Sequence, residues 1–469
     1  MNKLFLFAIG GTGSRVLKAL THLLAAGVKI NATEIIPVII DPDQSAGNKD
    51  EVLTLMDQYR TVQSALSPTD ASTTFFHTPL SPLPDGYMMN VCTNTTKSFS
   101  DYMDLSTLDD ENRAMADMLY SEKEQNAHMD IGFKGCPNMG CAVLNQFLQN
   151  PSFSQFANKF NAGDGIFIIS SIFGGTGASG FPLLLKTLRD THPDLPAGAA
   201  IQGAPIGGVT VFPYFKLTAE KSADINSDTF ISKMKAALSY YKRNLNGLDA
   251  LYYVGDTMNQ IYKNVSGGKG QRNAAHFVEL ISALAILDFA ATGTHGGATQ
   301  YKEFSIPEDK DPVTLPDLQR QTYDLLARPM TEFALFCKFM KFELSAARSQ
   351  TWFNHGQPNF SGILGGNFFN ALSAFCAAHL NWLDEMEKNS RSFSPFVLEN
   401  VASDVYGFAK GIPTQRVFSS KSNWALYETY LNDVNKSKAL TRQNNRAEGC
   451  FVAVACEANR KVVNGKIKL

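Results

Sequence analysis

A glycine-rich segment directly after a buried strand constrains the fold of this chain more than any other stretch of its sequence. Residues 166–172 are largely apolar and rich in isoleucine, which predicts a strand buried on both faces. Glycines follow at positions 174, 175, 177 and 180, and leucines at helical spacing follow Pro182. This order can form an anion cradle, because glycines let backbone N–H groups approach a phosphate and a helix dipole favours its charge. The alternative is a glycine-rich turn that only packs tightly.

The composition is that of a globular protein and argues against several kinds of partner. The 469 residues are 44% hydrophobic and 18% charged, with a net charge of −2, so nothing indicates nucleic acid or an anionic membrane. The seven cysteines are scattered without a Cys-x-x-Cys pair, so we expect a reduced, cytoplasmic protein with no metal site. No apolar run is long enough to span a membrane, and the run at residues 4–9 is short for a signal peptide.

A second unit of strand, glycine loop and helix stands at the N-terminus. Residues 4–9 predict a buried strand, and residues 14–26 predict a helix. The loop between them differs from a dinucleotide fingerprint, because Val16 occupies a position that requires a small residue. It also lacks the Gly-Lys-Ser/Thr of a Walker loop.

Two acidic residues follow the next predicted strand, residues 34–40. Pro37 within it indicates a sheet edge or a bulge. Asp41 and Asp43 come directly after the strand, where a carboxylate can contact a ribose or, through water, a phosphate-bound Mg²⁺. A polar strand end without a ligand is an equal alternative. Residues 48–129 contain helical patches and a Pro/Ser/Thr-rich span near 67–84, and they predict insertions and loops.

Strands and helices alternate through residue 256. The further segments are a glycine loop at 130–140, a helix from 141, strands at 207–212 and 250–254, and a helix at 225–243. This alternation predicts an α/β fold with a doubly wound, mostly parallel sheet. In such sheets the ligand lies beyond the carboxyl ends of the strands, where the glycine loops stand.

A long helix, predicted over residues 273–291, is apolar nearly all round and is therefore expected to lie buried between two domains. Its polar members, His276, Glu279 and Asp288, are interpreted as paired core or interface residues. We expect a nucleotide-binding domain (1–265), a central connecting helix (266–295) and an α+β or helix-rich C-terminal domain (296–469).

The C-terminal third gives weaker signals. We expect a charged loop at 303–311, helices at 315–326, 333–344 and 368–386, short β-like pieces at 451–455 and a solvated basic end at 460–468.

The order of these features resembles the tubulin and FtsZ superfamily, and more closely the divergent bacterial tubulin-like proteins. Five segments carry the resemblance over roughly the first 300 residues: 9–14, 135–140, 173–180, 209–215 and 273–280. The segment 173–180, Phe-Gly-Gly-Thr-Gly-Ala-Ser-Gly, is similar to the family's glycine signature and is the most specific of the five. The resemblance implies bound GTP or GDP with Mg²⁺.

The resemblance also implies which residues bind the nucleotide. The phosphates would contact the first loop (Gly10, Gly11, Thr12, Gly13, Ser14) and the fourth (Gly174, Gly175, Thr176, Gly177, Ala178). Asp41 and Asp43 would lie near Mg²⁺ and the terminal phosphate, which the loop containing Gly135, Cys136 and Asn138 would sense. Asn273 and Asp256 would contact the guanine edge, and Asn226 the ribose or base.

Three functions fit the sequence. The first is a GTPase that assembles head to tail into filaments and hydrolyses GTP at the subunit interface. The second is a nucleotide-binding module that neither hydrolyses nor polymerises and acts through protein partners. The family's acidic pattern is missing from residues 293–303, which favours the second and leaves the catalytic residue unassigned. The third is a dinucleotide-dependent enzyme, which the fingerprint spacing disfavours.

Overall fold

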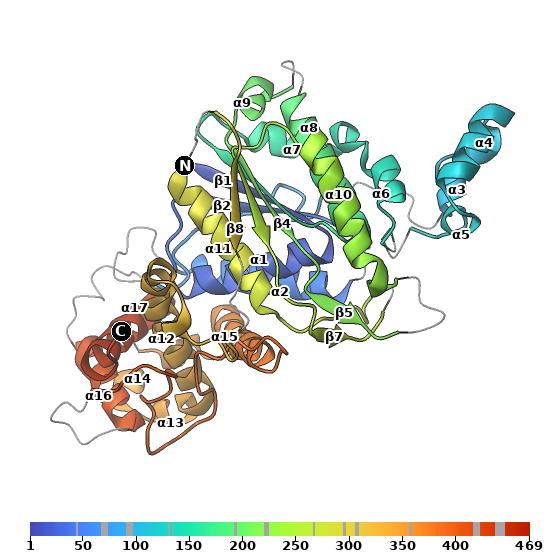
Figure 1. The fold of residues 1–469 in the computed structure, drawn as a ribbon. Helices are drawn as coiled ribbons and strands as arrows, with labels where there is room; N and C mark the ends of the chain where they lie inside the picture. The colour runs from blue at the N-terminus through green and yellow to red at the C-terminus, as the bar shows by residue number, and fades with distance from the viewer. Residues whose placement is uncertain are drawn as a thin grey trace.

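The computed structural model describes residues 1–43, 46–66, 74–90, 97–129, 132–133, 135–191, 195–219, 225–265, 268–293, 297–304, 309–355, 359–415, 423–436 and 446–469. Its centre is a six-stranded parallel sheet in the order β2-β1-β3-β4-β6-β8 (Figure 1). The strands are β1 (Lys3–Ile9), β2 (Glu34–Ile40), β3 (Gly165–Ser171), β4 (Ile206–Val211), β6 (Ala250–Val254) and β8 (Gln300–Phe304). A separate parallel pair is formed by β5 (Phe215–Leu217) and β7 (Gln260–Tyr262). The predicted doubly wound α/β sheet is therefore confirmed.

Helices of the first 300 residues cover both faces of this sheet or extend from it. They are α1 (Gly10–Ala25), α2 (Gly47–Gln63), α3 (Phe99–Tyr102), α4 (Asp110–Leu119), α5 (Glu122–Gln125), α6 (Pro137–Leu144), α7 (Pro151–Lys159), α8 (Gly175–Arg189), α9 (Gly198–Gln202), α10 (Phe230–Asn244) and α11 (Phe277–Thr292). Short 3₁₀ turns lie at Leu105–Thr107, Phe147–Gln149, Ser227–Thr229, Leu315–Asp317 and Ser361–Ile363.

The C-terminal region is helical, one of the two forms expected of it. It comprises α12 (Arg320–Phe342), α13 (Leu344–Ala347), α14 (Thr351–Asn354), α15 (Asn367–Glu387), α16 (Trp424–Lys436) and α17 (Ala447–Lys466). These helices gather on the α1 and α2 side of the sheet (Figure 1). Within the described ranges, none of the helices has the length and hydropathy needed to cross a bilayer.

Alternate residues of β1 show how the sheet divides the core in two. Leu4, Leu6 and Ala8 pack with α1, α2, α11 and the C-terminal helices. Phe5 and Phe7 point the other way and pack with α6, α7, α8 and α10. Because a strand buries its two faces alternately, a continuous apolar strand requires a helical layer on each side.

The edges of the sheet include one confirmed prediction and one correction. Pro37 lies in β2, which is an edge strand of the sheet, where a residue without an N–H is tolerated. The opposite edge, β8, contains Glu303, so the charged loop expected at 303–311 is wrong at its start. This strand also extends the sheet beyond residue 265, the end expected for the nucleotide-binding domain.

Residues 48–63 form most of α2, within the span where helical patches were expected among loops. Two further expectations about local structure are wrong. Residues 451–455 are helical within α17, because α12 and α16 cover this β-prone run on the apolar side of a helix. The basic end does not lie in solvent, since Val462, Val463 and Ile467 are buried.

Candidate functional site

The cavity that concentrates the predicted residues lies where the order of strands reverses. The chain runs from β1 to β2 on one side and returns to β3 on the other side of β1. The helices that follow β1 and β3 therefore separate at their N-termini, and ligands of open α/β sheets bind in the crevice between such connections. An open cavity of about 940 Å³, part of it continuous with solvent, occupies this position.

Two helices, α1 and α8, begin at this cavity with free donors. Within the described residues, no side chain caps either helix, and neither has an acidic residue in its first turn. Gly10, Gly11 and Thr12 line the cavity from α1. Gly174, Gly175, Thr176 and Gly177 line it from α8. The first N–H groups of a helix lack internal partners and carry partial positive charge, so this arrangement suits a phosphate-like anion.

Most glycines of both motifs, including Gly11, Gly13, Gly175 and Gly177, lie in helical turns, which corrects the expectation of glycine loops that end at about residue 14 and at Pro182. They allow close approach: a Cβ at Gly177 would lie 2.6 Å from the carbonyl oxygen of Ser171, and one at Gly13 would lie 2.7 Å from the carbonyl carbon of Ala8. Each helix therefore starts directly against the end of the strand that precedes it. Only Gly10, with φ +70°, needs the left-handed region.

A third segment, around Gly135, also lines the cavity. Gly135 lines the cavity at φ +76°, and its carbonyl oxygen accepts a hydrogen bond from Lys233 Nζ at 2.7 Å. A Cβ at Gly175 would lie 3.0 Å from the backbone nitrogen of Cys136, so α8 and this segment are in tight contact. Asn138 is exposed, and neither it nor Cys136 is among the residues that line the cavity.

The two predicted carboxylates lie at the floor of the cavity. Asp41 and Asp43 are 8% and 3% exposed, and both line it. Asp41 Oδ1 accepts the Asp43 N–H at 3.1 Å, and Asp43 Oδ2 accepts the Gly268 N–H at 2.8 Å. Burial, aided by the Asp43 carboxylate and opposed by the Asp43 N–H and Lys49, raises the pKa of Asp41 to about 7.

A buried ionic network supports α1 beneath the cavity. Arg15 Nε donates to Glu279 Oε1 at 2.6 Å, and Arg15 Nη2 donates to the Tyr214 hydroxyl at 2.7 Å and to Thr12 Oγ1 at 3.3 Å. The Tyr214 hydroxyl donates in turn to Glu279 at 2.8 Å. Burial opposes the charge of Arg15, but Tyr214 and Glu279 outweigh it and raise the pKa of Arg15. Arg15 thereby joins α1 to the first turn of α11.

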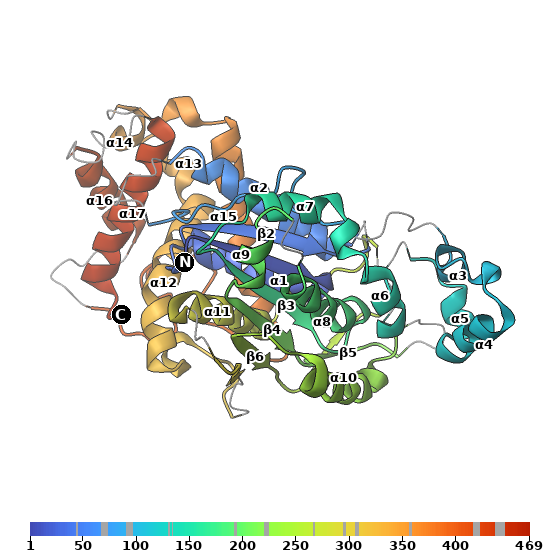
Figure 2. The same ribbon diagram turned by 90° about the horizontal axis from the view of Figure 1, so that it is seen from above.

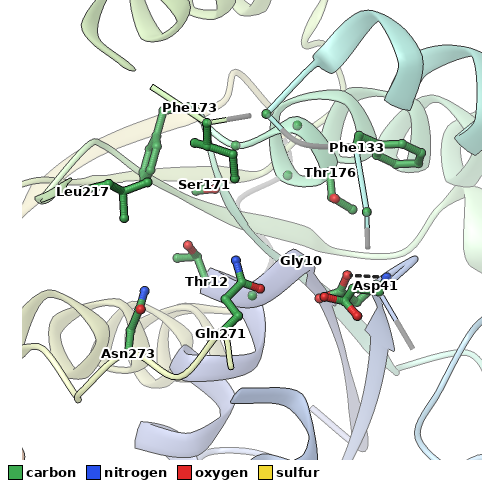
Figure 3. Close-up of a pocket in the computed structure, with 18 of the residues that line it drawn as sticks. Gly10, Thr12, Asp41, Phe133, Ser171, Phe173, Thr176, Leu217, Gln271 and Asn273 are labelled. Carbon is green, nitrogen blue, oxygen red and sulfur yellow. Dashed lines mark hydrogen bonds between the residues drawn. The ribbon is translucent and has the colours of Figure 1, made fainter. Parts of the chain in front are cut away.

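The end of the cavity away from Asp41 is lined mainly by apolar side chains. Figure 3 shows Asn273, Leu217 and Phe173 on one side of the view, and Thr176 and Asp41 on the other. The apolar wall there also includes Phe215, Ile225 and Phe230. An apolar wall with a few amide groups suits a planar, hydrogen-bonding ring system.

Several predicted residues lie elsewhere. Asp256 pairs with Arg391, with Nε and Oδ2 3.2 Å apart, and does not line the cavity. Asn226 is exposed, and its side chain accepts the Asp228 N–H at the start of a 3₁₀ turn. Ser14 and Ala178 are buried behind the lining residues. These roles stay predictions.

The sequence reasoning missed several lining residues. They include Arg15, Phe133, Ser171, Phe173, Phe215 and Gln271. Arg15 directly follows the first glycine motif, and its place in the first turns after that motif is a signal that could have identified it. Gln271 precedes the long helix in a segment without periodicity, so the sequence offered no comparable signal for it.

The carboxylates of α11 are paired as expected, whereas His276 Nδ1 accepts the Val278 N–H at 3.1 Å and its buried Nε2 has no hydrogen-bond partner among the described residues. Glu279 Oε2 accepts the His276 N–H at 3.1 Å, and Asp288 Oδ2 accepts the Tyr252 hydroxyl at 2.6 Å and pairs with Lys302. Among the described residues, no group of three or more His, Cys, Asp or Glu side chains could hold a metal ion.

The fold is α/β, and in the described part of the chain the candidate cavity is lined by two helix N-termini without capping side chains. No protein-family model matches the chain, and no curated protein matches it. It is similar to a solved structure of CetZ2 from Haloferax volcanii, described as a GTPgS-bound protofilament, with 14% identity over 62% of this chain and 59% of that chain and a TM-score of 0.29. It is also similar to CetZ from Methanosaeta thermophila strain DSM 6194, with 16% identity over 62% and 52% and a TM-score of 0.26.

The chain thus spans between half and three fifths of the solved chains that it matches. Both TM-scores are low, so we base the functional proposal on this chain's own fold and cavity.

Proposed function

We propose that this chain is a tubulin-like guanine-nucleotide-binding protein that holds the phosphates of GTP or GDP at the N-termini of α1 and α8. The observation that carries the proposal is the convergence of these two helix starts, each lined by glycines, on one cavity at the switch point of the sheet. The phosphates would accept hydrogen bonds from backbone N–H groups near Gly11 and Gly175, without a P-loop lysine.

The base would lie at the apolar end of the cavity. Phe173, Phe215 and Leu217 offer surfaces for a planar ring, and Asn273 and Gln271 offer amide groups for its edge. Guanine is favoured over adenine because the glycine motifs resemble those of the tubulin and FtsZ superfamily.

Asp41 and Asp43 fit the role of a Mg²⁺ pair. Mg²⁺ in nucleotide sites keeps several waters and is held by one or two carboxylates together with phosphates. Two buried carboxylates beside the helix N-termini match this requirement. Mg²⁺ would neutralise phosphate charge there and would favour the ionised form of Asp41.

GTP hydrolysis and filament assembly are separate questions from nucleotide binding. The carboxylate near the end of α11, Asp288, is already held by Tyr252 and Lys302. Because Asp288 is already paired, we favour a protein that binds GTP or GDP without hydrolysing it. A filament-forming GTPase would need a carboxylate from another position to reach the neighbouring subunit.

One set of measurements tests binding, turnover and assembly. The nucleotide released from the purified protein is identified by chromatography, and thermal melts are recorded with GTP, GDP and ATP. A ligand at about 100 times its Kd stabilises the folded state by about 2.7 kcal/mol, so GTP and GDP should raise Tm and ATP should not. Phosphate release and negative-stain images of the same sample distinguish a filament-forming GTPase from a protein that only binds the nucleotide.

Two substitutions locate the site. Gly175→Trp and Thr176→Ala should weaken GTP binding, the first because even a Cβ there would lie 3.0 Å from the Cys136 backbone nitrogen. The matched control is Gly203→Ala, where the nearest atom to an added Cβ is 3.4 Å away and the cavity is not involved. Equal GTP affinity in all three variants, or no nucleotide bound under any condition, would refute the proposal.

A further inference from the structure

A small helical arm projects from the body of the molecule and has no role in the cavity. It comprises α3, α4 and α5, and Figures 1 and 2 both show it standing apart from the sheet and its helical layers. Its connections to the body are local: Ser98 pairs with His128 across its base, and Gln146 Nε2 donates to the Tyr102 hydroxyl at 3.2 Å.

The arm is a structured unit rather than a loose loop. Its three helices each begin with a capping side chain, from Ser98, Asp109 and Ser121, and the last forms a capping box. Gln125 joins α5 to α4, because its Nε2 donates to Asp117 at 2.9 Å and its Oε1 accepts from Arg113 at 2.9 Å. The surface of α4 is therefore held in a fixed geometry.

The outer surface of α4 exposes an apolar face. Met115, Met118 and Leu119 are 60%, 88% and 54% exposed. Residues at spacings of three and four lie on one side of a helix, so these side chains form one continuous face. Nothing among the described residues covers this face. Leu108, just before the helix, is also exposed.

The arm is strongly acidic around this face. Residues 98–126 contain eight Asp or Glu and two Lys or Arg. One of the two cations, Arg113, is already held by Asp117 at 3.2 Å. A partner surface for the arm would therefore combine apolar side chains with uncompensated positive charge.

Helix α10 of the same chain has this chemistry. It contains Lys233, Lys235, Lys242 and Arg243 and no acidic residue. It also carries exposed apolar groups, Ile231 at 40% and Tyr240 at 51% exposure. At 100° per residue, Ile231 and Tyr240 lie on opposite sides of α10, and Lys235 and Lys242 fall within about 40° of Ile231 on the exposed side.

We propose that the arm of one copy docks on α10 of a second copy, with the Met115–Met118–Leu119 face of α4 against Ile231 and with the acidic groups of the arm against Lys235 and Lys242. The contact is between copies, because α4's apolar face stays exposed although α10 belongs to the same chain. The base of the arm already lies near α10 within one copy. Burial raises the pKa of Glu124, but hydrogen bonds from Ser121 and Cys136 and, least of all, the charge of Lys233 on α10 lower it overall.

Each copy would offer one arm and one α10, so the interface is heterologous. Such contacts generate rings if the rotation closes and open chains if it does not. The contact does not depend on bound nucleotide, since none of its residues lines the cavity. The area is small and the charges are exposed, so we expect weak association that high salt suppresses.

Sedimentation velocity of the full-length protein, over a range of concentrations and without added nucleotide, tests the proposal. Association should strengthen as salt is lowered. Met118→Ser/Leu119→Ser should weaken it by about tenfold or more, and so should Lys235→Glu/Lys242→Glu. The control is Ile261→Ser, which removes an apolar side chain that is 59% exposed on β7. Circular dichroism melts check that every variant is folded.

Mixing the two defective variants gives a sharper result. Each retains one intact surface, so the mixture should form a heterodimer and nothing larger, whereas each variant alone stays monomeric. The proposal is overturned if the wild-type protein is monomeric throughout the concentration range, if both variants associate as strongly as the wild type, or if the mixture of the two variants does not associate. Because no step uses nucleotide, failure of GTP binding would leave this result unaffected.

Discussion

The buried ion pair of Arg15 and Glu279 gives a quantitative test of how α1 is held beneath the cavity. The side chains are 7% and 2% exposed, and their charged atoms are 2.6 Å apart. Two unit charges about 4 Å apart attract by about 4 kcal/mol at an effective dielectric constant of about 20. Removing one partner of a buried pair costs about 3–5 kcal/mol, because it leaves the other charge uncompensated. We expect Arg15→Met to lower the free energy of unfolding by this amount.

A second substitution should recover much of the loss. In Arg15→Met/Glu279→Gln the buried negative charge is also gone, and the amide oxygen can still accept the His276 N–H that Glu279 Oε2 accepts at 3.1 Å. The double variant should therefore be more stable than the sum of the single changes predicts, with a coupling of about 0.5–3 kcal/mol.

Urea denaturation and thermal melts of the wild type, both single variants and the double variant supply the measurement. Arg320→Met is the matched control, because Arg320 is 94% exposed and its pair with Asp324 is at the surface. It should cost less than about 0.5 kcal/mol. The reasoning is refuted if Arg15→Met costs less than about 1 kcal/mol, or if the two single costs simply add.

Three further predictions follow from the same structure. Burial lowers the pKa of His379 to about 3 and that of His22 well below its usual value, so both side chains are neutral in the folded protein. Their full contribution to the free energy of unfolding is present above about pH 6.5. As the pH drops toward 3, the free energy of unfolding should fall by up to about 1.4 kcal/mol per pH unit for each histidine. Thermal melts from about pH 8 to about pH 5 should show this slope, and an unchanged slope in His22→Phe/His379→Leu would contradict it. Gly207→Ala should cost about 1–3 kcal/mol, because its Cβ would lie 2.6 Å from a phenylalanine ring, whereas Gly203→Ala should lower the melting temperature little. Asp256→Asn should lower the melting temperature, because it breaks an ion pair with the C-terminal domain, and should leave GTP affinity unchanged; a large loss of affinity would instead support its predicted contact with the base.

The strands and the site were predictable where the signal is local. The apolar runs that became β1 and β3 are buried on both faces, and such runs can be recognised without knowing their neighbours. The glycine motifs after them predicted a phosphate cradle, and Gly10, Thr12, Gly175 and Thr176 do line one cavity. Asp41 and Asp43 join them because parallel strands end at the same edge of the sheet.

The errors arise where packing overrides local preference. The glycines were interpreted as a loop, yet Gly175, Gly177 and Gly180 lie in the first turns of α8, since close contact with Ser171 and Ile9 requires a residue without Cβ. The β-prone run 451–455 became helical because α17 lies between other helices. Strand β8 is short and half exposed, so only its pairing with β6 identifies it.

The sequence by itself therefore determined five of the six strands of the main sheet, its parallel α/β character and the two glycine motifs that line the cavity. Apolar periodicity and the positions of glycines are properties of short segments, so they can be recognised without knowing how the rest of the chain packs. Only the tertiary structure decided which polar residues face the cavity, that Arg15 is neutralised by Glu279 from a helix 264 positions away, and that Asp256 pairs with Arg391 instead. It also decided that α4 presents its methionines to solvent, because exposure depends on what the rest of the chain covers.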